Sequence, residues 1–168
     1  CTCWLRDWVH QNEMIVLGFG DMVYELFDLR TPEKIFNSSF QTESPILDCQ
    51  ISPINNLFSF SHQNSCSVYD FRNPQSEILS FHPSEKKNIP YKIKWIGTDP
   101  LIAMANDDGV FNLVNIESKS SQLLKSYNLP VGKIIDLNTT DDTVIITQPN
   151  SLYVFQMNTR PLLLKALV

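Results

Sequence analysis

Short hydrophobic segments, mostly four to seven residues long, recur along the whole chain and are separated by polar or turn-forming residues. Most of these segments are rich in β-branched, aromatic or aliphatic side chains, and Pro, Gly, Asn or Asp stands at their ends. Such segments are typical of β-strands. No window keeps apolar residues at the helical spacing i, i+3, i+4 and i+7 over a dozen positions. The pattern therefore predicts an all-β chain.

Four of the predicted strands share an ending, a large apolar residue followed by a polar one. These endings are Phe27-Asp28, Tyr69-Asp70, Val114-Asn115 and Phe155-Gln156. They lie 42, 45 and 41 residues apart. A repeat of about 40–45 residues that holds four strands is the unit of a β-propeller blade. We therefore expect one β-propeller segment over residues 1–168, with blades at about 1–42, 43–87, 88–129 and 130–168.

Each blade is expected to contain four strands. The predicted ranges are 2–5, 14–18, 22–27 and 34–37 in the first blade, and 46–51, 56–60, 66–69 and 77–81 in the second. They are 91–96, 101–104, 110–114 and 122–126 in the third, and 133–137, 144–146, 152–155 and 162–165 in the fourth. Turns are predicted at Gly20-Asp21, Asn73-Pro74, Asp107-Asp108-Gly109 and Asn150-Ser151, and a loop over 117–121.

The blade pattern resembles the WD40 repeat, whose third strand ends in Trp-Asp and whose hairpin often carries an Asp about six positions earlier. Phe27-Asp28 and Tyr69-Asp70 stand in the place of Trp-Asp, and Asp21 and Asp108 stand at the hairpin position. The resemblance covers essentially the whole chain as four degenerate repeats. It implies a WD40-like propeller.

The chain departs from the WD40 pattern at several points. No Gly-His pair precedes a first strand, and Gln63 and Pro149 replace the hairpin Asp in the second and fourth blades. We therefore expect the blades to be held together mainly by apolar packing between sheets. Because seven blades are usual in the family, the resemblance implies part of a seven-bladed ring, and a ring of four blades is the alternative. The other blades would lie outside this fragment or come from a partner chain.

Composition narrows the classes of partner. The 168 residues carry 43% hydrophobic and 18% charged residues, which is typical of a globular protein, and the net charge is −5. Proteins that bind duplexes usually present a basic face, so nucleic acid is not expected as a direct ligand. The apolar runs are too short for a membrane span, and no secretory signal is visible. A cytoplasmic or nuclear protein is expected.

The residues that could bind metal or perform catalysis are scattered. Cys1, Cys3, Cys49 and Cys66 do not form the paired spacing of a zinc site, so they are expected to be reduced and mostly buried. The histidines are far apart, at His10, His62 and His82. No cofactor, metal, small-molecule substrate or catalytic residue is predicted.

The sharpest local motif is an aromatic-Asp-x-Arg sequence that occurs twice, at Phe27–Arg30 and at Tyr69–Arg72. It resembles the box by which WD40 substrate receptors dock on the adaptor of cullin-4 ligases. That resemblance implies partner-binding roles for Asp28, Arg30, Asp70 and Arg72. An arginine just past a strand end can offer a planar fork of donors to a partner. The alternative interpretation is that both arginines pair with acids of their own blades.

One further candidate lies in the loop 6–10. Trp8 is expected either to contact a partner, as interface aromatics often do, or to pack against its own sheet. Taken together, the sequence predicts a non-catalytic scaffold for protein–protein interaction, a WD40-like subunit of a multiprotein complex. The alternatives are a substrate receptor of a cullin-4 type ubiquitin ligase and a propeller hydrolase.

Overall fold

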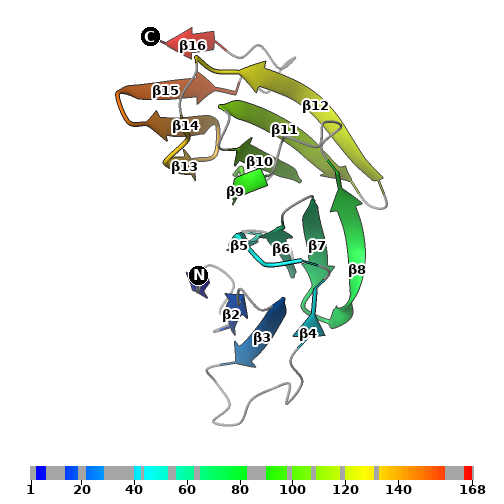
Figure 1. The fold of residues 1–168 in the computed structure, drawn as a ribbon. Coiled ribbons are helices and arrows are strands. Elements are labelled where there is room, and N and C mark those ends of the chain that lie inside the picture. The colour runs from blue at the N-terminus through cyan, green and yellow to red at the C-terminus, as the bar shows by residue number, and fades with distance from the viewer. Residues whose placement is uncertain are drawn as a thin grey trace. The chain divides into compact units, whose positions relative to one another are not determined.

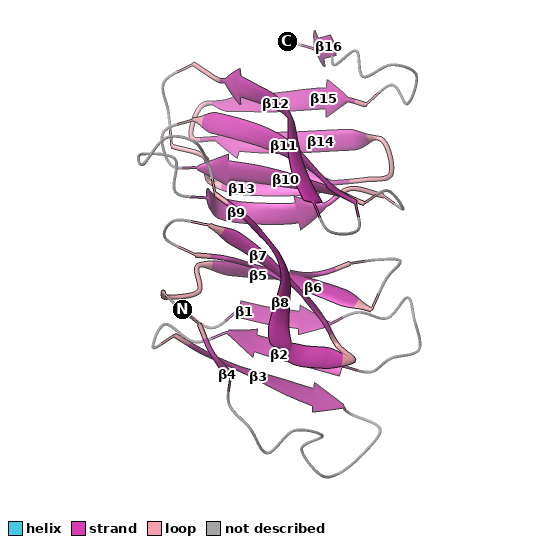
Figure 2. Ribbon diagram, turned by 90° about the vertical axis from the view of Figure 1, so that its right-hand side faces the viewer, coloured by secondary structure: helices cyan, strands magenta, loops and turns pink. Residues whose placement is uncertain are grey.

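The structure is a computed structural model, and it describes most of the chain (Figure 1). The described residues are 3–6, 14–18, 22–28, 40–42, 44–52, 56–62, 65–82, 90–97, 100–106, 109–117, 120–130, 133–157 and 165–167. Within these ranges all regular structure is β-strand, as Figure 2 shows. The described residues include no helix that could span a bilayer. The all-β prediction is therefore confirmed.

The strands form four antiparallel sheets, and each sheet consists of four strands that follow one another in sequence. The first sheet contains β1 (Cys3–Arg6), β2 (Met14–Gly18), β3 (Val23–Asp28) and β4 (Phe40–Gln41). The second contains β5 (Asp48–Ile51), β6 (Leu57–Ser61), β7 (Cys66–Asp70) and β8 (Asn73–Phe81). The third contains β9 (Pro90–Trp95), β10 (Leu101–Asn106), β11 (Val110–Glu117) and β12 (Ser120–Asn128). The fourth contains β13 (Asp136–Thr139), β14 (Thr143–Gln148), β15 (Ser151–Gln156) and β16 (Lys165–Leu167).

The chain divides into two compact units of two sheets each, Cys1–His82 and Pro83–Val168. In the first unit, Tyr24 of β3 is buried against an aromatic group of the second sheet. Its ring centroid lies 4.7 Å from that of Phe60 and 5.6 Å from that of Tyr69. Phe58 stacks on Tyr69 at 5.3 Å and is itself fully buried. Aromatic contact between two sheets thus forms the core of this unit.

In the second unit, the third and fourth sheets share one apolar core. Burial alternates along β14, where Val144, Ile146 and Gln148 are buried and the residues between them are half-exposed. The core residues contributed by the third sheet and the turn after β9 are Ile96, Leu101, Ala103, Ala105, Phe111 and Leu113, and those of the fourth and its flanks are Ile134, Leu137, Val144, Ile146, Phe155 and Met157. Apolar packing between sheets, which the sequence predicted, therefore holds each unit together.

The outer strand of the second sheet begins earlier than the sequence predicted. Asn73-Pro74 was predicted to form a turn, but both residues belong to β8, and the turn consists of Phe71 and Arg72. The register shifts twice between β7 and β8, so β8 carries extra residues that have no partner on β7. A proline fits such a bulge on an outer strand because no ladder hydrogen bond requires its missing N–H.

Two further predictions were wrong in detail. The range 117–121 was predicted to be a loop, but β11 reaches Glu117 and β12 begins at Ser120, and these two residues pair. Residues 118–119 lie outside the described residues. The first strand of the fourth sheet begins at Asp136, not at Lys133. Ile134 is buried, whereas the next residue, Ile135, is 51% exposed. The N–H of Ile135 donates to the Thr147 carbonyl at 2.8 Å, although Ile135 precedes the strand. The predicted strand 34–37 and the turn at Gly20-Asp21 lie outside the described residues.

Candidate protein interaction site

The hairpin between β7 and β8 carries the second aromatic-Asp-x-Arg motif. Asp70 is the last residue of β7 and pairs with Asn73, so Phe71 and Arg72 form the tight turn between the two strands. Tyr69, the aromatic residue of the motif, is buried in the core of the first unit. The motif thus joins a core position to an exposed turn across four consecutive residues.

Asp70 and Arg72 are bound to each other through several hydrogen bonds. The Asp70 carboxylate accepts from the backbone N–H of Arg72 at 2.8 Å, from its Nε at 2.9 Å and from its Nη2 at 2.5 Å. The Asp70 side chain is 14% exposed, whereas that of Arg72 is 76% exposed. The hydrogen bonds from Arg72 lower the pKa of the Asp70 carboxyl, and the same contact raises the pKa of Arg72. The carboxylate therefore fixes the arginine in one orientation at the surface.

Two contacts made by Phe71 also hold this turn against the second sheet. The Phe71 ring is half-buried and lies 4.8 Å, centroid to centroid, from that of Phe58. The Phe71 N–H donates to the Asn56 carbonyl at 2.8 Å. The turn therefore has little freedom to move away from the sheet, and Arg72 is presented from a rigid base.

The alternative that the sequence left open, pairing within the blade, is observed for Arg72. Nε and Nη2 face Asp70, so that edge of the guanidinium is already used. Among the described residues no hydrogen bond is found for Nη1, and this group can donate to a further acceptor. Partner binding by Asp70 and Arg72 stays a prediction.

The first copy of the motif is described only in part. Asp28 is the last residue of β3, and its backbone pairs with Met14 of β2. The side chain of Asp28 lies outside what the structure describes, and so do Arg30 and Trp8. Their partner-binding roles also stay predictions.

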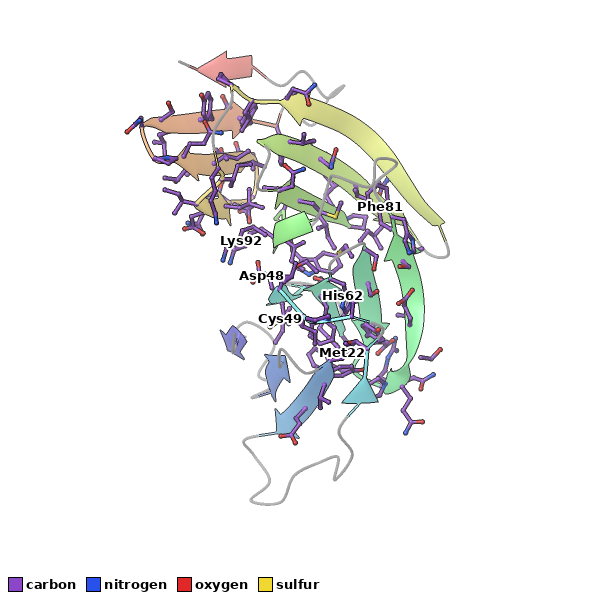
Figure 3. The ribbon with its side chains drawn as sticks, viewed as in Figure 1. Met22, Asp48, Cys49, His62, Phe81 and Lys92 are labelled. Carbon is purple, nitrogen blue, oxygen red and sulfur yellow. The ribbon has the colours of Figure 1, made fainter. Side chains whose placement is uncertain are left out.

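Buried polar groups lie elsewhere in the first unit. Figure 3 labels Cys49 and His62, both of which belong to the second sheet and its flank. Cys49 and Cys66 are buried and form no disulfide, as predicted for them, and burial raises the pKa of Cys66 to about 12. The Nδ1 of His62 lies 3.3 Å from the Ser44 carbonyl oxygen. The described residues contain no group of three or more His, Cys, Asp and Glu side chains that could hold a metal ion.

The sequence did not reveal one contact that supports the hairpin. The hydroxyl of Tyr24, in β3 of the first sheet, donates to the carbonyl of Pro74 at the start of β8. The bulge in β8 leaves that carbonyl without a partner on β7 and so makes it available. No sequence signal links two residues in different sheets in this way.

Comparison with known proteins gives a fold and no family. No protein-family model matches the chain, and no curated protein matches it in sequence. Among solved structures it is similar to the β-propeller domain of Cps50 (Swd1) from Myceliophteria thermophila, with a TM-score of 0.76 over 98% of this chain and 14% sequence identity. This chain spans 56% of the length of that structure. At such low identity the likeness shows the fold alone, and it confirms the predicted β-propeller.

Proposed function

We propose that this chain is part of a WD40-like propeller that acts as a non-catalytic scaffold for protein–protein interaction within a larger assembly. The β-propeller fold and the four antiparallel sheets support the proposal. Propellers place variable turns at the edges of rigid sheets, where partners can bind without disturbing the core. The function is proposed for the cytoplasm or nucleus, where the reduced state of Cys49 and Cys66 would be maintained.

The observation that carries the proposal is the rigid presentation of Arg72. The Arg72 side chain is 76% exposed, yet its position is fixed by hydrogen bonds to Asp70. The Nε, the Nη2 and the backbone N–H of Arg72 all donate to the Asp70 carboxylate. The core does not require this arginine, because the core contact of the turn is made by Phe71. A fixed, charged side chain with one free edge suits recognition of a carboxylate or carbonyl on a partner protein.

The test uses the polypeptide purified from its own cells with an affinity tag. We expect it to elute as a complex, and we expect Arg72→Ala to remove at least one stoichiometric partner. Gln75→Ala is the matched control, because Gln75 is also exposed and lies on the same hairpin. A wild-type polypeptide that sediments with its own mass alone, without any partner, would rule out the scaffold role.

A narrower function, a substrate receptor of a cullin-4 type ubiquitin ligase, is supported by one observation. The motif at Tyr69–Arg72 does present its arginine at the surface, with Nη1 pointing to no described partner. Docking through the other edge would first have to break the contact with Asp70. The test replaces both Arg30 and Arg72 by Ala and measures recovery of the ligase adaptor in a pull-down. Unchanged recovery would end this hypothesis.

A further inference from the structure

The outer strand of the second sheet has an open edge. β8 is the last strand of that sheet, and among the described residues it pairs with β7 alone (Figure 1). A strand in this position presents backbone N–H and C=O groups that no neighbouring strand of its own sheet uses. β8 is nine residues long, which is enough to pair with an extended segment of another chain.

Part of β8 also lacks a partner on β7. Asp70 pairs with Asn73, and Tyr69, the residue before Asp70, pairs with Glu77. The three residues at positions 74–76 therefore bulge out of the ladder. At this point the start of β8 is separated from the strand that would otherwise use its hydrogen-bonding groups.

The bulge is anchored at one end and exposed beyond it. Pro74 is buried, and its carbonyl accepts from the Tyr24 hydroxyl. Gln75 and Ser76 are both exposed. Successive residues of a strand direct their N–H and C=O groups to opposite sides, so one of these two residues directs both groups to the open edge. The bulge thus offers exposed backbone groups in a fixed position.

The charged side chains along this edge differ in sign. Arg72 directly precedes β8, and Asp70 holds its guanidinium through Nε and Nη2. Glu77 follows the bulge and is exposed. A segment bound along β8 would gain from a carboxylate beside Arg72, and it would lose from a carboxylate opposite Glu77.

An apolar side chain lies at the other end of the same stretch. Ile78 is 45% exposed, and it has no partner on β7 because Val68 pairs with Leu79 and Tyr69 with Glu77. At about 3.3 Å per residue, Arg72 and Ile78 lie at most about 20 Å apart along the chain. A bound segment of about six or seven residues would reach both.

We propose that the open edge of β8, over residues 72–78, binds an extended segment of a partner protein by strand addition. The segment carries a carboxylate that accepts from Nη1 of Arg72, an uncharged or basic residue opposite Glu77, and an apolar residue that packs on Ile78. In strand addition the backbone hydrogen bonds supply affinity and the alternate side chains supply specificity. The inference rests on the proposed scaffold role and defines the chemistry of its partner.

The test separates the backbone of β8 from its side chains. The tagged protein is purified from its own cells as wild type, Gln75→Ala, Ser76→Ala, Gln75→Pro and Ser76→Pro. Alanine keeps the backbone N–H, whereas proline removes it. Neither position has a partner on β7, so proline removes no ladder hydrogen bond from the sheet.

We expect the partner that depends on Arg72 to be recovered at least about tenfold less in one of the two proline variants, because a pairing N–H is then missing. Both alanine variants should recover it as wild type does. Wild-type recovery in both proline variants would overturn the inference. An equal loss in the alanine variants would also overturn it, since recognition would then use the side chains of these residues.

A second measurement decides the question if proline lowers the urea midpoint. The photoreactive residue p-benzoylphenylalanine replaces Gln75 in the native protein, and mass spectrometry identifies the cross-linked segment of the partner. We expect an extended segment with an Asp or Glu within about seven residues of the cross-link, the length that spans the β8 edge. A cross-link to a helix, to a segment without an acid, or to no protein at all would contradict strand addition.

The same photoreactive residue at Gln156, which is exposed on β15 of the fourth sheet, is the matched control and should not capture this segment. The two proposals can fail separately. A partner that is lost in Arg72→Ala but kept in both proline variants would remove strand addition and leave the scaffold role standing. A wild-type protein without any partner would remove both.

Discussion

The hydroxyl of Tyr24 donates a hydrogen bond to the carbonyl oxygen of Pro74, and this contact joins the first sheet to the outer strand of the second. The Tyr24 ring lies at the same time among Phe58, Phe60 and Tyr69. One side chain thus fills the core of the first unit and satisfies the carbonyl that the β8 bulge releases. The contact couples the core to the strand that carries the Asp70–Arg72 turn.

Tyr24→Phe should therefore destabilise the first unit without emptying its core. We expect a loss of about 1–2 kcal/mol in the free energy of unfolding, because the variant leaves a buried carbonyl without its donor. Urea denaturation measures it. Tyr153→Phe is the matched control, since this half-buried tyrosine makes no hydrogen bond through its hydroxyl among the described residues. Equal urea midpoints for Tyr24→Phe and wild type would contradict the hydrogen bond between the Tyr24 hydroxyl and the Pro74 carbonyl.

The same residue predicts a dependence of stability on alkaline pH. Burial, and secondarily Tyr69, raises the pKa of Tyr24 above that of an unfolded tyrosine, about 10. The folded state therefore holds this proton more tightly, so its contribution to stability is complete below about pH 10 and declines as the pH rises further. The urea midpoint of wild type should fall more steeply between pH 10 and 11 than that of Tyr24→Phe. Parallel slopes would show that the hydroxyl is not buried.

The Asp70–Arg72 pair predicts that the stability of the protein depends on pH in the acidic range. Hydrogen bonds from Arg72 lower the pKa of Asp70 below its unfolded value of about 3.9. The stability that this aspartate contributes is therefore present above about pH 3.9 and is lost as the pH falls through the lower, folded-state pKa. Arg72→Ala should raise the pKa of Asp70, as measured by NMR titration, whereas Gln75→Ala should not. An unchanged pKa in Arg72→Ala would mean that the pair does not form in solution.

The sequence predicted the sheets better than the contacts between them. Strand composition and the repeat of the Phe27, Tyr69, Val114 and Phe155 endings indicated four four-stranded sheets, because alternation and spacing are local properties. The pattern around Pro74 was misleading, because Asn-Pro is typical of a turn and the bulge that tolerates it depends on the neighbouring strand.

The residues of the candidate site were predicted from the sequence, but the contacts that support them were not. Asp70 and Arg72 were recognised from their motif, and pairing of the arginine with an acid of its own blade was one of the two interpretations. The link between Tyr24 and Pro74 could not be predicted, because the two residues are 50 positions apart and belong to different sheets. The faces of the fourth sheet also needed coordinates, since only the ladder registers of β13, β14 and β15 show which residues share a face.

The backbone conformation of Met22 predicts that replacing this residue by glycine relieves strain. It precedes β3 with a φ of 68°, a left-handed conformation that a side chain makes unfavourable, and it is 42% exposed. Met22→Gly should stabilise the protein by up to about 1 kcal/mol, since glycine adopts this conformation freely but also loses more chain entropy on folding. Met22→Ala keeps the strain and should not stabilise. A thermal or urea midpoint that falls on Met22→Gly would contradict the left-handed conformation.

Gly97 should be the least replaceable glycine of those that the structure describes. It lies in the turn after β9 with a φ of +50°, and a Cβ built there would lie 2.7 Å from the carbonyl oxygen and 2.8 Å from the Cα of Asp141. Close by, the Thr139 hydroxyl donates to the Trp95 carbonyl at 2.6 Å, so the third and fourth sheets meet at this point. The obstructing atoms are backbone and cannot rotate away.

Gly97→Ala should therefore cost about 2–4 kcal/mol, the sum of the left-handed penalty and the displacement of a packed backbone. Gly109→Ala shares the positive φ, at 83°, on the hairpin between β10 and β11, and serves as the comparison. Urea denaturation should show the larger loss for Gly97→Ala. A loss no greater than that of Gly109→Ala would mean that the Asp141 backbone does not press against this turn in solution, and the packing of the fourth sheet on the third would then need revision.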